Sequence, residues 1–149
     1  MKVVLQRVSE ASVHINQEEV ASIQKGLLLF LGVVEGDTSE DIHWLCNKIV
    51  HCRIFPDEAQ VMNRSILQNE GDIIVVSQFT LHANTKKGHR PSYNAAAKPE
   101  VAIPIYKAFI KQLEKELGKP IKTGEFGADM KVQLVNDGPV TIIIDTEHK

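Results

Sequence analysis

The stretch that decides the fold is Asp72–Leu81, which reads DIIVVSQFTL. Its first half is a run of β-branched residues, which is typical of a strand buried in the middle of a sheet. Its end is polar, and in a continuing strand Gln78 and Thr80 share one face while Ser77 lies on the other. We expect a central strand over 72–81, and its polar carboxyl end is well placed to line a pocket. The alternative is a strand that becomes polar only because it reaches the surface.

Other strands surround this one along the chain. Residues 4–8 and 11–15 alternate between apolar and polar, which predicts half-buried strands. Residues 20–23 predict a short strand, and the continuous apolar run 26–34 (GLLLFLGVV) predicts a strand covered on both faces. Two last strands are expected over 130–135 and 140–145. Turn-forming residues separate them at 136–139 (NDGP), which predicts a tight reversal.

Two helices are expected. Residues 37–41 (DTSED) supply an N-cap and acids for a first turn. The apolar stripe behind them has helical spacing and consists of Ile42, Leu45, Cys46, Ile49 and Val50. A second helix over 99–117 ends at Gly118, and Pro104 predicts a late start or a distorted first turn. Its predicted buried stripe is Ala102, Ile105, Tyr106, Phe109 and Leu113. Between the helices, the segment after Phe55-Pro56 predicts a loop with at most one short strand.

Composition narrows the class of protein. The 149 residues fit one α/β domain, and 17 Lys and Arg against 19 Asp and Glu argue against a protein that coats DNA. No apolar run reaches the roughly 18 residues of a membrane span, and no secretory signal opens the chain. We therefore expect a cytoplasmic protein with neither membrane nor DNA as a partner. Cys46 and Cys52 predict free, buried thiols, and the histidine spacing predicts no metal site or other cofactor.

The peptide bond between Gly138 and Pro139 is the second informative feature. An X-Pro bond adopts the cis form at a cost of about 0.5–1 kcal/mol. A cis bond would turn the carbonyls of Asp137 and Gly138 outward as hydrogen-bond acceptors. The alternative is an ordinary turn with a trans proline, which most X-Pro bonds adopt.

The segments SQFTL at 77–81 and NDGPVT at 136–141 together resemble the signature motifs of the D-aminoacyl-tRNA deacylases. The resemblance covers the whole chain through MKVVLQRVSEASV (1–13), LLLFLGVVEGDT (27–38), KIVHCRIF (48–55) and GEFGADMKVQLVNDGPV (124–140). It implies one domain over 1–149, with mixed β-sheets in a layered, barrel-like arrangement and two main helices. It also implies a homodimer whose active sites lie at the subunit interface.

The resemblance assigns roles to individual residues. The catalytic pocket is expected to be lined by Ser77, Gln78, Phe79 and Thr80. The partner subunit would insert its Gly138-Pro139 turn, which Arg7 would hold in place. Walls of the pocket are expected from Ala102, Phe126 and Met130.

The implied reaction is hydrolysis of the ester between a D-amino acid and the terminal ribose of tRNA, which is a proofreading step in translation. The turn would reject L-amino acids, and glycyl-tRNA would be a second substrate because glycine has no side chain to exclude. The ribose 2′-OH would assist the attacking water, and main-chain N–H groups near Phe79 and Thr80 would hold the oxyanion.

Two alternatives remain open at this stage. Thr80 could be a nucleophile with His82 as its base, or the chain could be a dimeric RNA-binding module without catalytic activity. Contacts with tRNA phosphates are expected from the basic cluster of Lys86, Lys87, His89 and Arg90, which could equally be an ordinary solvated loop.

Overall fold

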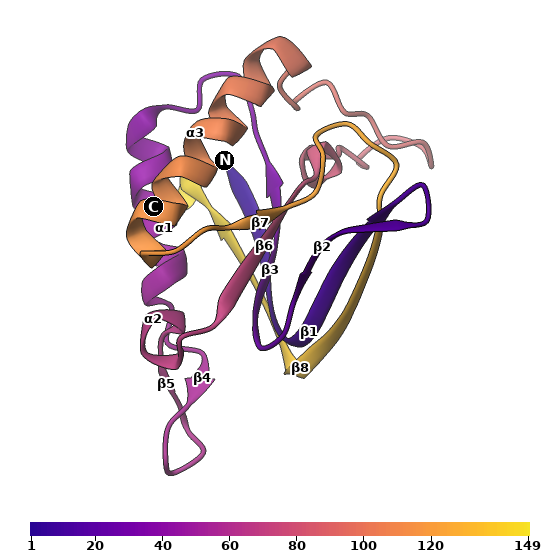
Figure 1. The fold of residues 1–149 in the computed structure, drawn as a ribbon. Helices are drawn as coiled ribbons and strands as arrows, with labels where there is room; N and C mark the ends of the chain where they lie inside the picture. The colour runs from indigo at the N-terminus through magenta and orange to yellow at the C-terminus, as the bar shows by residue number, and fades with distance from the viewer.

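A mixed six-stranded sheet forms the body of the molecule in the computed structural model, which describes residues 1–149 (Figure 1). Its strands are β1 (Lys2–Ile15), β2 (Glu18–Ile23), β3 (Gly26–Gly32), β6 (Asp72–Ser77), β7 (Lys122–Thr123) and β8 (Lys131–Asp145). The order is β2-β1-β3-β6-β7, with β8 on the other edge of β1. The β3–β6 and β6–β7 pairs are parallel, and β1 is antiparallel to its three neighbours. Because β2 also approaches β6 and β7, the sheet is nearly closed. The predicted barrel-like α/β fold is confirmed.

The long strand β1 contributes to two cores. Val3 and Leu5 pack into the core beneath the helices, whereas Val8 and Val13 belong to a second core inside the curled sheet. Val8 faces this second core by ordinary alternation along the strand. A β-bulge between Val8 and Glu10, which pair with the adjacent residues Asn136 and Val135, brings Val13 to the same side. The two predicted strands over 4–8 and 11–15 are therefore one continuous strand. Between the cores lies β3, buried on both faces as its apolar run predicts.

The last part of the chain corrects a prediction. Residues 131–145 form one strand, β8, that pairs with β1 along its whole length, so no tight reversal separates two strands at 136–139. Gln6 pairs with Thr141 and Val8 with Asn136, which leaves four residues of β8 opposite Arg7 alone. The turn residues therefore form a protrusion from the strand, and the chain keeps its direction on either side of it.

Two main helices cover one face of the sheet and pack against each other (Figure 1). Helix α1 (Ser39–His51) begins at a capping box formed by Thr38 and Asp41, and it buries the five residues that its periodicity predicts. Helix α3 (Pro99–Leu117) ends at Gly118 in the left-handed conformation, with φ of 78°. It starts at Pro99 and continues through Pro104, so the helix does not begin late. Ile105 is only half-buried.

Between α1 and β6 the chain forms a small arm, which extends to the bottom of Figure 1. It consists of a hairpin, β4 (Phe55–Pro56) with β5 (Met62–Arg64), and of the short helix α2 (Ile66–Asn69). The sequence predicted at most one short strand in this segment. Both cysteines are free thiols, as predicted, with Cys46 buried and Cys52 half-buried. Burial raises the pKa of the Cys46 thiol to about 12.

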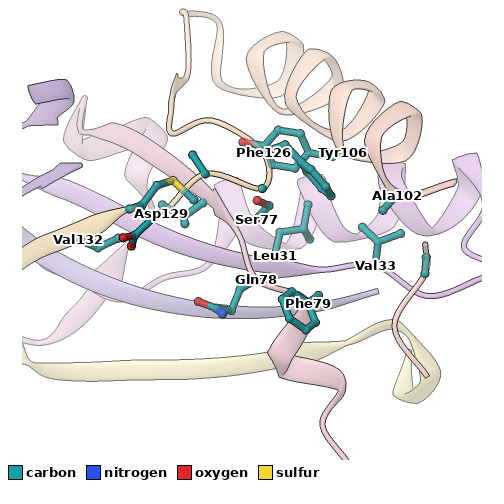
Figure 2. Close-up of a pocket in the computed structure, with 15 residues that line it drawn as sticks. Leu31, Val33, Ser77, Gln78, Phe79, Ala102, Tyr106, Phe126, Asp129 and Val132 are labelled. Carbon is teal, nitrogen blue, oxygen red and sulfur yellow. The ribbon is translucent and has the colours of Figure 1, made fainter. Parts of the chain in front are cut away.

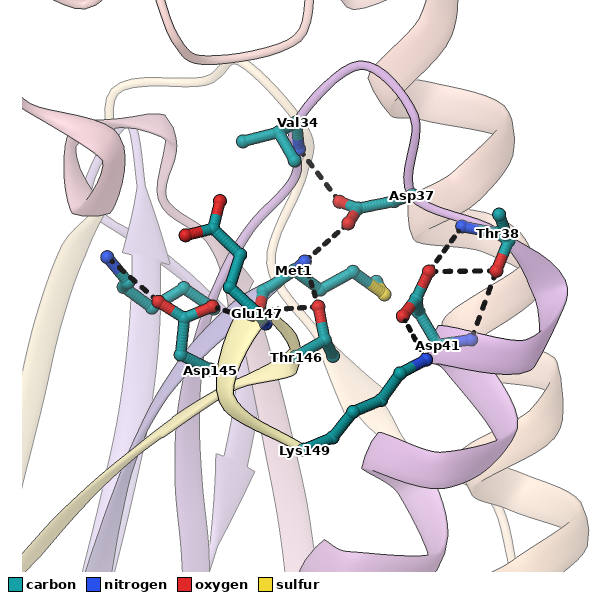
Figure 3. A network of polar contacts seen from close by, with 10 residues as sticks. Met1, Val34, Asp37, Thr38, Asp41, Asp145, Thr146, Glu147 and Lys149 are labelled. Atoms are coloured by element: carbon teal, nitrogen blue, oxygen red, sulfur yellow. Dashed lines mark hydrogen bonds and ion pairs between the residues drawn. The ribbon is translucent and has the colours of Figure 1, made fainter.

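The two ends of the described chain meet beside α1 (Figure 3). The Thr146 N–H donates to the Met1 carbonyl at 2.9 Å, and the Met1 nitrogen contacts Asp37 and the Thr146 hydroxyl. Lys149, which follows the short 3₁₀ helix η2 (Thr146–His148), reaches Asp41 on α1 with an Nζ–Oδ1 distance of 2.8 Å. These contacts fasten β8 and β1 to the helical layer. None of the helices has the length and apolar character needed to span a bilayer.

Candidate active site

Strand β6 ends earlier than its sequence predicts. Strand β6 stops at Ser77, and Gln78 makes the last sheet hydrogen bond, from its N–H to the Leu31 carbonyl at 2.8 Å. Residues Phe79–His82 then form a 3₁₀ helix, η1. The predicted continuation of the strand to residue 81 is therefore wrong, and the side chains of η1 do not alternate between two faces. The N–H groups of Phe79 and Thr80 open this helix, where no intrahelical acceptor exists for them.

A cavity of about 330 Å³ opens beside the end of β6 (Figure 2). Eleven of its fifteen lining residues are hydrophobic, so it suits an apolar group better than a charged one. It lies between β6 and η1, helix α3, and the segment that leads into β8.

Six of the predicted site residues line this cavity. They are Ser77, Gln78, Phe79, Ala102, Phe126 and Met130. Four other predicted residues are not among its lining: Thr80, Arg7, Gly138 and Pro139. The first three residues of the motif, Ser77–Phe79, and the wall residues are thus brought together within one chain, whereas the Gly138-Pro139 turn is not among the lining.

Tyr106 is a lining residue that was predicted only as part of a buried helix face. Its hydroxyl donates to the Val75 carbonyl at 3.3 Å, and its ring meets Phe126 edge-to-face at 5.7 Å. Burial raises the pKa of Tyr106 to about 12, so the phenol stays neutral and fixes the wall. Its polar tip was the only sequence signal that could have distinguished it from a core residue.

Further lining residues that sequence reasoning missed are Leu31, Val33, Val76, Ala97, Gly127, Ala128, Asp129 and Val132. Asp129 is the only carboxylate among them, and it forms an ion pair with Lys131, with an Nζ–Oδ1 distance of 2.7 Å. Both of these side chains are largely exposed. Nothing in the local sequence around 126–132 indicates that this segment faces α3.

The alternative that pairs Thr80 with His82 as its base is not supported, because no contact joins the two side chains. The Gln78 side-chain amide donates to the Thr80 hydroxyl at 2.6 Å, and this is the only hydrogen bond of that hydroxyl. The His82 Nε2 is buried without a hydrogen-bond partner and packs against Gly32. A Cβ at Gly32 would lie 2.8 Å from His82 Cδ2. No base therefore contacts the Thr80 hydroxyl in this structure.

Arg7 contacts the protrusion of β8, as the resemblance implied. This buried side chain donates from Nε to the Asp137 carbonyl at 2.9 Å and from a terminal nitrogen to the Ile54 carbonyl. The peptide bond between Gly138 and Pro139 is cis, and both residues are exposed. Gly138 has φ of 146°, and a Cβ there would lie 2.7 Å from the Val140 side chain, so only glycine fits.

The basic cluster lies on a loop that follows η1. Asn84 and Ser92 exchange two main-chain hydrogen bonds of 2.8 and 3.0 Å, which close the base of the loop. Its four basic residues are all exposed and make no ion pair within the chain. They are Lys86, Lys87, His89 and Arg90. This basic loop thus presents the unpaired positive charges of Lys86, Lys87 and Arg90 to solvent.

Comparison with known sequences gives consistent results. A family model described as D-Tyr-tRNA(Tyr) deacylase matches residues 4–145. The D-aminoacyl-tRNA deacylase of Bacteroides fragilis (strain YCH46) is 63% identical over all of this chain and 99% of its own length. That of Flavobacterium psychrophilum is 62% identical over the same shares.

Solved structures show the same fold. The c-Myc DNA unwinding element binding protein superposes with a TM-score of 0.91 at 38% identity, over 98% of this chain and 99% of its own. A structure described as a "probable eukaryotic D-amino acid tRNA deacylase" superposes with a TM-score of 0.81 at 17% identity. That match covers 96% of this chain and 97% of the other, and it concerns the fold alone.

Proposed function

This chain belongs to the D-Tyr-tRNA(Tyr) deacylase family, and from that premise we propose how its pocket removes D-amino acids from tRNA. Its relatives are D-aminoacyl-tRNA deacylases, which are hydrolases of an ester bond. The observation that carries the proposal is the apolar cavity at the end of β6, lined by Ser77, Gln78 and Phe79. The side chain of the amino acid would occupy this cavity, with its ester at the opening beside η1.

The oxyanion that develops during hydrolysis needs donors at that opening. The N–H groups of Phe79 and Thr80 support this role, because they begin η1 and find no acceptor within it. Main-chain donors fixed by a helix need little reorganisation when charge develops on the ester oxygen. The Gln78–Thr80 side-chain hydrogen bond would help to hold the two residues in place.

The attacking water needs a base, and the side chains around the cavity are poorly suited to supply one. Thr80 is engaged with Gln78, and Tyr106 stays neutral at physiological pH because its pKa is about 12. Asp129 is paired with Lys131. We therefore assign the task to the substrate: the 2′-OH of the terminal ribose, next to the ester, would orient or activate the water.

The active unit would be a homodimer in which the turn of one subunit completes the pocket of the other. Strand β8 pairs with β1 on one edge and has no partner on its second edge. The turn at Gly138-Pro139 protrudes from this strand, and Val135 and Ile143 are exposed on either side of it. A long free edge with apolar residues is typical of a strand that another chain covers.

Selection between mirror images would come from main-chain atoms of this inserted turn. Carbonyl groups there would accept hydrogen bonds from the α-amino group of the substrate and leave space for a side chain only in the D direction. An L side chain would collide with the turn, whereas glycine would fit. Arg7 supports the role of the turn as a rigid element, since it holds the Asp137 carbonyl.

The exposed basic loop, which the Asn84–Ser92 bridge closes, supports contacts with the tRNA backbone. Lys86, Lys87 and Arg90 have no ion-pair partner in the chain, so phosphates could neutralise them without breaking a contact. Contacts of this kind bind every tRNA alike and weaken as salt rises.

The test is to incubate the purified protein with D-tyrosyl-tRNA, L-tyrosyl-tRNA and glycyl-tRNA and to measure the remaining ester. We expect hydrolysis of the D-tyrosyl and glycyl esters and survival of the L-tyrosyl ester. Equal hydrolysis of both mirror images would exclude selection by the turn, and an intact D-tyrosyl ester would indicate a binding module instead.

A second measurement addresses the role of the RNA. D-tyrosyl-tRNA whose terminal ribose carries hydrogen in place of the 2′-OH should bind with similar affinity but resist hydrolysis. Undiminished turnover of this substrate would contradict catalysis assisted by the 2′-OH.

A further inference from the structure

Phe79 and Tyr93 form an exposed aromatic pair at the rim of the cavity. Their ring centroids are 5.1 Å apart and their planes meet at 76°, an edge-to-face arrangement. Phe79 is 55% exposed and Tyr93 39% exposed, although both are large apolar side chains. An edge-to-face pair covers at most one face of one ring, so ring surface of both residues stays accessible to a ligand. Paired exposed aromatics beside a pocket indicate a contact surface for a ligand.

The pair is held in position by the main chain. Phe79 belongs to η1, and Tyr93 directly follows the Asn84–Ser92 bridge that closes the base of the basic loop. Behind Tyr93, its carbonyl accepts from the Ala96 N–H at 3.0 Å, and the Ala97 N–H donates to the Val33 carbonyl at 2.9 Å. The Tyr93 ring is thus fixed at the rim, and its hydroxyl makes no hydrogen bond within the chain.

The pair adjoins two features of the proposed function. One is the cavity, of which Phe79 itself is a lining residue. The other is the basic loop with Lys86, Lys87 and Arg90, which lies between Phe79 and Tyr93 in the chain and suits phosphates. In an aminoacyl-tRNA the terminal ribose joins the ester, the base and the backbone phosphate. An ester held at the cavity therefore places the terminal base near its rim, with the phosphates farther out.

We propose, resting on the proposed function, that Tyr93 together with Phe79 is the stacking surface for the 3′-terminal base of the tRNA. Every base has a π face, so stacking holds the base without reading its hydrogen-bonding edge. Tyr93 is then a binding residue: it holds the base, and through the base it retains the ribose and the ester at the cavity. Substitution of the terminal adenine by another purine should consequently change hydrolysis little.

The experiment compares two small esters of D-tyrosine, one with adenosine and one with a methyl riboside that has no base. Tyr93→Leu removes the aromatic face but keeps apolar bulk, and Tyr93→Phe keeps the face. For the adenosine ester, Tyr93→Leu should raise KM about tenfold or more with little change in kcat, whereas Tyr93→Phe should stay near the wild type. For the base-free ester, wild type and Tyr93→Leu should have the same kcat/KM.

An equal loss for both esters would overturn the proposal, since it would indicate that Tyr93 only supports the loop. An unchanged KM for the adenosine ester would overturn it as well. Direct binding gives a further readout, because the fluorescence of 2-aminopurine riboside monophosphate is quenched when its base stacks. Wild type should quench it and Tyr93→Leu should not. Failure of the proposed function is distinguishable, since the wild type would then leave D-tyrosyl-tRNA intact.

Discussion

The hydroxyl of Thr80 is at the centre of the SQFTL motif, but its only hydrogen bond is with the Gln78 amide. Because no base reaches it, Thr80→Val should retain kcat on D-tyrosyl-tRNA within about tenfold of the wild type. Loss of a true nucleophile would cost about 10⁶-fold in kcat. Single-turnover kinetics measure the difference. A loss of kcat near 10⁶-fold, together with a covalent acyl-enzyme in the mass spectrum of the wild type, would contradict this expectation.

At this scale, the sequence was informative where a residue acts through its immediate neighbours. The cap at Thr38 and the buried face from Ile42 to Val50 depend on helical spacing alone, and both were predicted correctly. The spacing of Thr80 and His82 left a dyad open as an alternative, but η1 directs the imidazole against Gly32. Asp129 and Tyr106 could not be assigned to the cavity, since their approach depends on the packing of α3 against a distant segment.

Among the elements, η1 depends most on a close contact with its neighbour β3. Gly32→Ala would place a Cβ 2.8 Å from His82 Cδ2 and 3.1 Å from the Gln78 carbonyl oxygen. η1 must then move, and a displacement near 1 Å at a catalytic element costs about 10- to 100-fold in kcat/KM. Steady-state kinetics on D-tyrosyl-tRNA, with Tm as a check on folding, measure the effect.

The matched controls for this prediction remove the imidazole. His82→Ala alone should keep most of the activity, because the ring makes no contact with the cavity. The double variant Gly32→Ala with His82→Ala should recover part of the lost kcat/KM, since only the Gln78 carbonyl oxygen still crowds the new Cβ. A double variant no better than Gly32→Ala would refute the steric explanation, and inactivity of His82→Ala would restore the histidine as a base.

The elements that the sequence predicted well are those whose pattern is local, such as β3 with its continuous apolar run and α3 with its terminal Gly118. The carboxyl end of β6 and the course of β8 were predicted wrongly, whereas β6 starts at Asp72 as predicted. Asn136–Pro139 has the composition of a reversal, but its direction is set by β1, which pairs with residues on both sides of it. Composition carries no information about the register between β1 and β8. A two-residue strand such as β7 is too short to show an alternation of apolar and polar residues.

On the scale of the whole molecule, the proposed dimer places the outer face of β8 between two subunits. Ile143 is 67% exposed in the single chain, so Ile143→Asp should not disturb the core. We expect this variant to be monomeric in analytical ultracentrifugation and to lose nearly all activity on D-tyrosyl-tRNA, because a buried unpaired carboxylate opposes association. The control is Val61→Asp on the arm, a valine that is 58% exposed, which should leave a dimer. An active Ile143→Asp monomer would refute the shared site.

The contact between Lys149 and Asp41 predicts how stability depends on pH. The hydrogen bond from the Lys149 side chain, together with bonds from Thr38, lowers the pKa of Asp41 from 3.8 to about 2. Because the folded pKa lies below the unfolded one, the stabilisation is present above pH 3.8 and is lost as pH falls toward 2. Lys149→Met should therefore lower Tm at pH 7, and the difference from wild type should shrink below pH 3.8 and be lost as pH falls through 2. Thermal melts across this range measure it.

Lys131→Met is the control for that series, because it removes an ion pair between two largely exposed side chains. Its Tm should stay close to that of the wild type at every pH. A Tm difference for Lys149→Met that persisted unchanged at pH 2 would show that the lysine acts through packing instead of through the Asp41 carboxylate.

The pairing of β1 with β8 has a consequence for synthesis on the ribosome. In the nascent chain β1 emerges first of all the strands and β8 last, so one edge of β1 waits uncovered while the rest of the domain is translated. A polypeptide that stalls before residue 131 would have β3 and the helices but an open, apolar strand edge. Such edges recruit one another. Interrupted translation of this protein should therefore yield aggregates and substrates for chaperones, not a smaller folded domain.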